Sequence, residues 1–150
     1  MPMRSVASKL LWADTWRPVW ALPHWLVFLT AELPDRHSER EMAIERAFAA
    51  LESTQERWYE AEVLRQQGEL RRARGDTEGA ERSYLEAIRT ADEQGSMLHK
   101  LKASLSLAKL WRELARTQEA RQMLSPVVRW FAGQPDAPVL QDAREVLTSI

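Results

Sequence analysis

The stretch GELRRARGDTEGAERSYLEA, residues 68–87, contains the pattern that decides the fold. Gly75 and Asp76 predict that one helix ends and another begins, because glycine suits the left-handed position after a helix and aspartate accepts hydrogen bonds from the first free amides. Gly68 lies before this turn, and Ala80 lies twelve positions later, after it. In an antiparallel helix pair, small residues at these two places would let the two backbones approach closely.

The same arrangement recurs forty positions later in AKLWRELARTQEARQMLSPV, residues 108–127. Small or apolar residues occupy matching places in both stretches, which favours a repeated helix hairpin over two unrelated ones. In each hairpin, we expect the large residue four positions after the second small residue to pack between its own helix and the next pair. The predicted packing positions are Gly68, Ala80, Tyr84, Ala87, Ala108, Ala120, Leu124 and Val127.

Apolar stripes at helical spacing continue outward from this repeat, and strict alternation is nowhere sustained. The predicted fold class is therefore all-α, with antiparallel helix hairpins stacked as a short tetratricopeptide-like right-handed solenoid. We expect a tryptophan-rich segment over residues 1–24 and a repeat domain over residues 25–150. The units of that domain span residues 25–52, 53–95 and 96–132, and a capping helix over residues 136–150 covers the apolar end of the stack.

The composition excludes several classes of function. The chain has 150 residues, a net charge of −1 and no cysteine. Nucleic-acid binders carry a positive excess, so we expect no nucleic-acid partner. The most apolar run, WLVFL at residues 25–29, is far shorter than the roughly 18 residues of a membrane span, so we expect no membrane association either. The lack of cysteine fits a reducing cytoplasm, which is the predicted location.

No catalytic pattern stands out. The glycines do not form a phosphate-binding loop, and no Gly-x-Ser-x-Gly nucleophile motif is present. The histidines His24, His37 and His99 do not share a helix face at metal-ligand spacing. We therefore expect no catalytic residues, no cofactor and no metal, and an enzyme is the weaker hypothesis.

In a stack of this kind the first helix of each pair lines a concave groove. Counted from Gly68 and Ala108, the groove face includes Glu62 and the candidate partner-binding residues Arg65, Glu69, Arg72, Lys102, Leu105, Lys109 and Arg112. The second half of this set is basic, and spacings of three and four place its charges on one face. Such a groove could bind an acidic segment or a terminal carboxylate of a partner protein. The alternative is an ordinary solvated helix face.

The tryptophans at the start of the chain have a spacing of their own. Trp12, Trp16 and Trp20 recur every four residues, which would place three indole rings on one helix face. Pro18 argues against one unbroken helix there. One interpretation is a helix whose rings cover the core. The other is an exposed aromatic patch through which the chain self-associates.

Two stretches carry a resemblance to a known family. ERWYEAEVLRQQGEL, residues 56–70, and ASLSLAKLW, residues 103–111, resemble the C-terminal tetratricopeptide region of large bacterial signalling ATPases. Many members of that family also contain a class III adenylate or guanylate cyclase domain. The resemblance covers residues 42–150 and implies a helical-repeat array that follows a catalytic module. Arg71 and Arg72 depart from the family pattern, which more often has leucines there.

The ATPase and cyclase portions of that family have no counterpart in this sequence, so none of its catalytic activity carries over. Two functional hypotheses follow. The first is a non-catalytic protein–protein interaction module built of tetratricopeptide-like repeats. The second is a regulatory tail of a multidomain signalling ATPase or nucleotide cyclase, with no independent partner.

Overall fold

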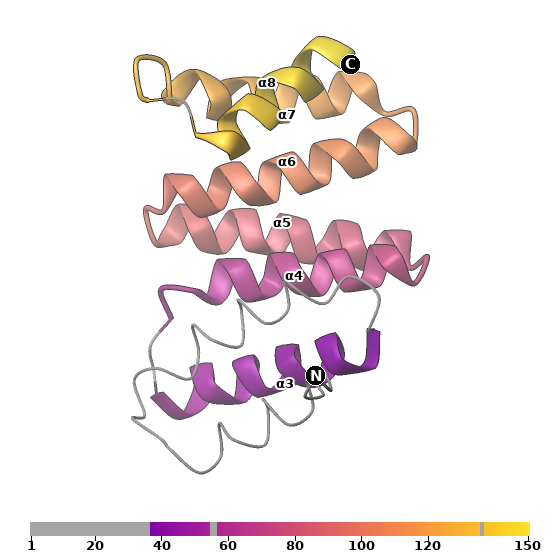
Figure 1. Ribbon diagram of the computed structural model, residues 1–150, viewed down its shortest axis with the longest axis vertical. Coiled ribbons are helices and arrows are strands. Elements are labelled where there is room, and N and C mark those ends of the chain that lie inside the picture. The colour runs from indigo at the N-terminus through magenta and orange to yellow at the C-terminus, as the bar shows by residue number, and fades with distance from the viewer. Residues whose placement is uncertain (1–36, 55–56, 136) are drawn as a thin grey trace, which may run out of the picture. The chain divides into compact units, whose positions relative to one another are not determined.

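The computed structural model describes residues 37–54, 57–135 and 137–150, and every regular element within them is an α-helix (Figure 1). The all-α prediction is therefore confirmed for this part of the chain. The predictions for Trp12, Trp16 and Trp20 lie outside the described residues. The helices are α3 (His37–Thr54), α4 (Glu60–Ala73), α5 (Thr77–Glu93), α6 (Met97–Glu113), α7 (Thr117–Trp130) and α8 (Pro138–Ser149).

The chain divides into two compact units, Met1–Tyr59 and Glu60–Ile150. In the first unit, α3 has an apolar stripe with spacings of three and four residues, as expected of an amphipathic helix. This stripe consists of the buried residues Ala43, Ile44, Ala47 and Leu51. None of the helices within the described ranges is both long and apolar enough to cross a bilayer.

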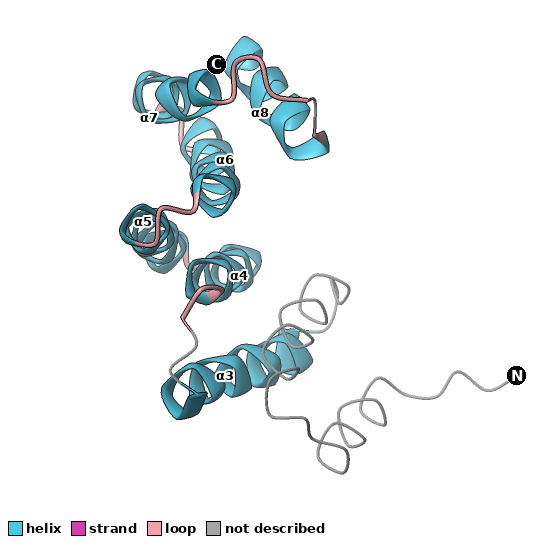
Figure 2. Cartoon of the chain, turned by 90° about the vertical axis from the view of Figure 1, so that its left-hand side faces the viewer, coloured by secondary structure: helices cyan, strands magenta, loops and turns pink. Residues whose placement is uncertain are grey.

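In the second unit, consecutive helices run antiparallel and each packs against the next (Figure 1). In addition, α4 contacts α6 directly, and α6 contacts α8. Seen along the helices, α4, α6 and α8 lie on one side of the unit and α5 and α7 on the other (Figure 2). The first helices of successive hairpins therefore touch one another without an intervening layer.

Three turns in this unit recur at intervals of twenty residues. Each has one residue with positive φ, namely Gly75 (79°), Gly95 (65°) and Ala115 (59°). The next amide in each case donates to a carbonyl five residues earlier, which is the bond that closes a helix in a Schellman motif. The three bonds run from Asp76 to Arg71 (2.9 Å), from Ser96 to Ala91 (2.8 Å) and from Arg116 to Trp111 (2.8 Å).

The eight repeat positions predicted from the sequence are all buried, at Gly68, Ala80, Tyr84, Ala87, Ala108, Ala120, Leu124 and Val127. Gly68 of α4 faces the ring of Tyr84 of α5 so closely that a Cβ atom at position 68 would lie 2.5 Å from Cε1 of that ring. The position therefore requires glycine while tyrosine occupies position 84. In the second hairpin the corresponding residues are Ala108 and Leu124.

We expect Gly68→Ala to destabilise the protein by about 1–2 kcal/mol, because overpacking against a buried ring outweighs the better helix propensity of alanine. The double change Gly68→Ala with Tyr84→Leu copies the second hairpin and should cost less than the sum of the two single changes. Urea unfolding followed by circular dichroism measures all three variants. A Gly68→Ala protein as stable as the wild type would contradict the close contact.

Ala115 occupies the position that glycine holds in the two preceding turns. Because a side chain in the left-handed region costs about 1 kcal/mol, Ala115→Gly should stabilise the protein by about 0.5–1 kcal/mol. Ala132→Gly is the matched control, since Ala132 is also exposed but is not among the residues with positive φ. Thermal unfolding should show a higher midpoint for the first variant only, and a lower midpoint would contradict the turn geometry.

Candidate functional site

The residues predicted to line a groove lie on α4 and α6, two helices in direct contact. Their exposure differs from one position to the next. Leu105 is only 6% exposed and belongs to the hydrophobic core, so it presents no open surface. Arg112 is exposed. The remaining predicted residues, Arg65, Glu69, Arg72, Lys102 and Lys109, are half-buried.

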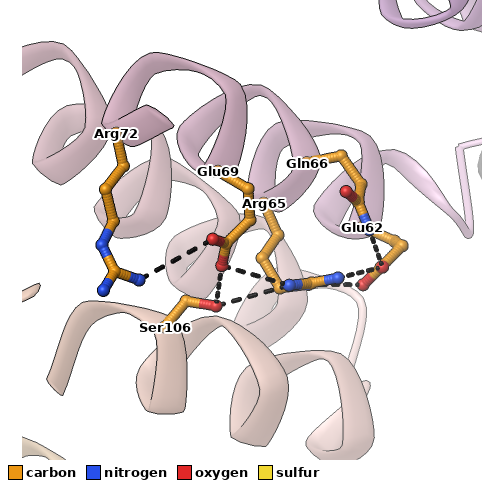
Figure 3. Close-up of polar contacts among 6 residues, drawn as sticks. All are labelled: Glu62, Arg65, Gln66, Glu69, Arg72 and Ser106. Atoms are coloured by element: carbon orange, nitrogen blue, oxygen red, sulfur yellow. Dashed lines mark hydrogen bonds and ion pairs between the residues drawn. The ribbon is translucent and has the colours of Figure 1, made fainter. Parts of the chain in front are cut away.

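On α4, Arg65 forms a two-pronged ion pair with Glu62. Its Nε lies 3.0 Å from one carboxylate oxygen and its Nη2 lies 2.7 Å from the other (Figure 3). The Gln66 amide also donates to this carboxylate, at 3.1 Å. The side chains of Arg65 and Glu62 are only 18% and 9% exposed, so this pair is largely withdrawn from water.

The same network crosses from α4 to α6. The Ser106 hydroxyl donates to Glu69 at 2.6 Å, and Nη1 of Arg65 lies 3.4 Å from both of these groups (Figure 3). Arg72 lies 3.9 Å from Glu69 and is also paired with Glu113 near the end of α6. We call this set of residues the polar ladder; it consists of Glu62, Arg65, Gln66, Glu69, Arg72, Ser106 and Glu113.

Only part of the polar ladder could be predicted from the sequence. The pairs of Arg65 with Glu62 and Glu69 follow from spacings of three and four on one helix. Ser106 and Glu113, which sequence reasoning missed, lie 37 and 41 positions from their partners. The forty-residue repeat could have indicated these two residues, because it predicts that equivalent positions of α4 and α6 lie side by side.

The ladder alters the ionisation of its members. Burial disfavours the charged form of Glu62, but the hydrogen bond and charge of Arg65 outweigh that effect and hold the pKa of Glu62 below its usual value of 4.5. Burial likewise opposes the charge of Arg65, whose pKa is nevertheless raised by Glu62 and Glu69. Both groups therefore remain charged at neutral pH.

On α6, Lys100 pairs with Asp92 at 2.6 Å, but three other cations lack a carboxylate partner within the described residues. Over the ranges that the structure describes, Lys102 and Lys109 form no ion pair or hydrogen bond, although the charge of Lys102 helps to lower the pKa of Glu62. Arg112 donates to the Ser149 hydroxyl of α8 at 2.9 Å, which is a neutral partner. We call Lys102, Lys109 and Arg112 the basic line.

His99 lies on α6 near the start of the basic line. Nδ1 of its ring lies 2.9 Å from the hydroxyl of Ser96, the residue that precedes the helix. Burial lowers the pKa of His99, and the charges of Lys102 and Arg65 lower it further against the opposing effect of Glu62. The ring is therefore neutral at pH 7 and adds no charge to this surface.

A second polar cluster, also missed by sequence reasoning, joins α5, α6 and the turn before α7. The Glu81 carboxylate accepts a hydrogen bond from the Trp111 indole at 2.8 Å and two from Arg116 at 2.9 and 3.0 Å. The Arg116 guanidinium also lies 4.7 Å from the centre of the Trp111 ring, a cation–π contact. The cluster ties three successive helices together, which is a structural role.

These arrangements suit binding by charge and hydrogen bonding. Among the residues with described positions, no group of three or more histidine, aspartate or glutamate side chains could hold a metal ion. No family model, no curated protein and no solved structure matches the chain.

Removal of the Glu62 charge should make stability depend less on pH. Because the pKa of Glu62 is lower in the folded state, its charge contributes stability above about pH 4.5, and that contribution disappears as the pH falls through the folded-state value. We expect Glu62→Gln to destabilise the protein by about 1–2 kcal/mol at pH 7 and by much less at pH 3.

Urea unfolding at the two pH values measures this difference. Glu78→Gln is the control, because Glu78 is exposed and lies outside the ladder. The substitution removes the same charge as Glu62→Gln. A Glu62→Gln penalty that stays constant between pH 7 and pH 3 would contradict the role assigned to the ion pair.

Proposed function

We propose that residues 60–150 form a short tetratricopeptide-like right-handed stack whose α4–α6–α8 side holds a segment of another protein, without catalysis. The observation that carries this proposal is the direct contact of α4 with α6 and of α6 with α8. Contacts between every second helix create one continuous side made of the first helices of the two hairpins, α4 and α6, and of α8. In helical-repeat proteins, surfaces of this kind are the ones that bind extended partners.

The repeat supports the stacked arrangement. Two hairpins share the twelve-residue spacing of small residues, from Gly68 to Ala80 and from Ala108 to Ala120. All four positions are buried. Turns with positive φ at intervals of twenty residues give α5 and α6 equal lengths of 17 residues. Equal helices joined by equal turns would rotate each hairpin by a similar amount relative to the previous one, as a solenoid requires.

The chemistry of the α4–α6–α8 side favours a polypeptide as the partner. Half-buried charged groups are distributed along α4 and α6, including Glu69, Lys102 and Lys109. A mixture of both signs suits the side chains and backbone of a peptide better than a uniformly negative phosphate backbone. The overall net charge of −1 agrees with this preference.

A site-specific crosslinking experiment tests the proposal. A photoreactive amino acid is placed in the full chain at Lys109 or Arg112, on α6, and at Arg82 or Arg121, which are exposed on α5 and α7. After irradiation in a lysate of the native cells, we expect the two α6 positions to crosslink the same protein, identified by mass spectrometry. The α5 and α7 positions should not crosslink it.

Crosslinks to that protein from all four positions would contradict binding on one side of the stack. Crosslinks from Arg82 and Arg121 alone would assign the partner to the opposite side. Absence of any crosslinked protein, while each variant keeps the helical circular dichroism of the wild type, would contradict the proposed function itself.

A further inference from the structure

The two first helices carry opposite charges at equivalent places. Forty positions separate Glu62 from Lys102 and Glu69 from Lys109, so the second repeat has lysines where the first has glutamates. Arg72 is kept as Arg112, although their surroundings differ. In α4 the arginine lies 3.9 Å from Glu69, whereas in α6 the equivalent neighbour is a lysine.

This exchange leaves Arg65 and Arg72 of α4 paired with carboxylates, whereas Lys102, Lys109 and Arg112 of α6 have no carboxylate partner within the described residues. Every cation of the ladder has a carboxylate partner, since Arg65 pairs with Glu62 and Glu69, and Arg72 pairs with Glu69 and Glu113. In the part of the chain with described positions, no carboxylate lies within ion-pair distance of the basic line, Lys102, Lys109 and Arg112.

Burial distinguishes the lysines of the basic line from ordinary surface cations. Arg82, Arg121 and Arg129 also form no side-chain hydrogen bond or ion pair in the described ranges, but they are exposed and their charges are solvated. Lys102 and Lys109 are half-buried, so part of each side chain packs against the protein and is more restricted than a fully exposed lysine. A carboxylate from a partner would therefore form charge-assisted hydrogen bonds with them at a smaller cost in side-chain entropy.

We propose that the basic line is the part of the α4–α6–α8 side that makes the decisive contacts, and that its occupant is an acidic polypeptide segment. This inference rests on the function proposed above. At a rise of about 1.5 Å per residue, Lys109 and Arg112 lie about 10 and 15 Å along α6 from Lys102. An extended peptide advances about 3.4 Å per residue, so a segment of about five residues reaches all three cations.

The ladder restricts where this segment can bind. A peptide carboxylate placed over α4 would lie near the negative charges of Glu62 and Glu69. Arg65 already forms ion pairs with both glutamates. The same carboxylate placed over α6 meets three cations, and two acids of the ladder near them, Glu62 and Glu113, are already paired with Arg65 and Arg72. Charge complementarity therefore selects α6 over α4.

The test uses the full chain and a fluorescein-labelled decaglutamate peptide, with binding measured by fluorescence anisotropy. We expect saturable binding that weakens as salt is raised from about 50 to 300 mM, because screening shortens the reach of exposed charges. The variant Lys102→Glu/Lys109→Glu/Arg112→Glu should bind at least about tenfold more weakly. The neutral variant Lys102→Gln/Lys109→Gln/Arg112→Gln should also bind decaglutamate more weakly than the wild type. Because it introduces no reversed charges, a loss of affinity in this variant cannot be attributed to misfolding caused by them.

Arg82→Glu/Arg121→Glu/Arg129→Glu is the matched control, because it makes the same change in net charge on α5 and α7. It should bind the peptide within about threefold of the wild type, since its cations lie off the basic line. Equal loss in this control would show that only net charge matters and would overturn the proposal. A ten-nucleotide single-stranded oligothymidylate that binds as tightly as decaglutamate, and depends on the same three residues, would also overturn it in favour of nucleic acid.

The crosslinking result separates this inference from the function on which it rests. If Lys109 crosslinks a partner but decaglutamate does not bind, the acidic occupant is wrong and the protein-binding stack stands. If decaglutamate binds through the basic line, the inference is supported independently of the partner's identity.

Discussion

The close approach of α4 and α5 is the constraint on which the rest of the second unit depends. The ring of Tyr84 lies where a side chain at position 68 would otherwise be, so the two backbones can pack at this distance only with glycine there. Ala80 and Tyr84 of α5 are fully buried, and α4 also contacts α6 directly. The absence of a Cβ atom at position 68 is therefore what allows the Tyr84 ring to pack against α4.

Polar contacts determine which cations on the α4–α6 side have carboxylate partners. The ladder couples α4 to α6 through Ser106 and Glu113 and uses all of its own cations in doing so. At the equivalent places of α6, Lys102 and Lys109 form no hydrogen bond or ion pair within the described residues, and Arg112 donates only to the neutral Ser149 hydroxyl. The two first helices therefore differ in that the ladder cations of α4 have carboxylate partners and these three cations of α6 do not. This division follows from side-chain contacts and from the half-burial of Lys102 and Lys109.

Much of the fold was predictable because it depends on local chemistry. Glycine at positions 75 and 95 marks two turns, and the spacing of small residues identified all eight buried repeat positions. The third turn uses Ala115 in the left-handed region, where the residue type alone signals nothing and alignment with Gly75 would have been needed. The candidate site was harder to predict. The link from Ser106 to Glu69 and the cluster around Glu81 join residues 30–37 positions apart, and such contacts depend on rotamers and helix register.

The central claim is that the Tyr84 ring of α5 packs directly against Gly68 of α4. Nuclear Overhauser spectroscopy of the isotopically labelled full chain measures it directly. The account predicts strong cross-peaks between the Hα protons of Gly68 and the ring protons of Tyr84, since a Cβ at position 68 would lie 2.5 and 2.7 Å from two carbons of that ring. A folded, helical protein in which Tyr84 shows no cross-peak to Gly68 would contradict it.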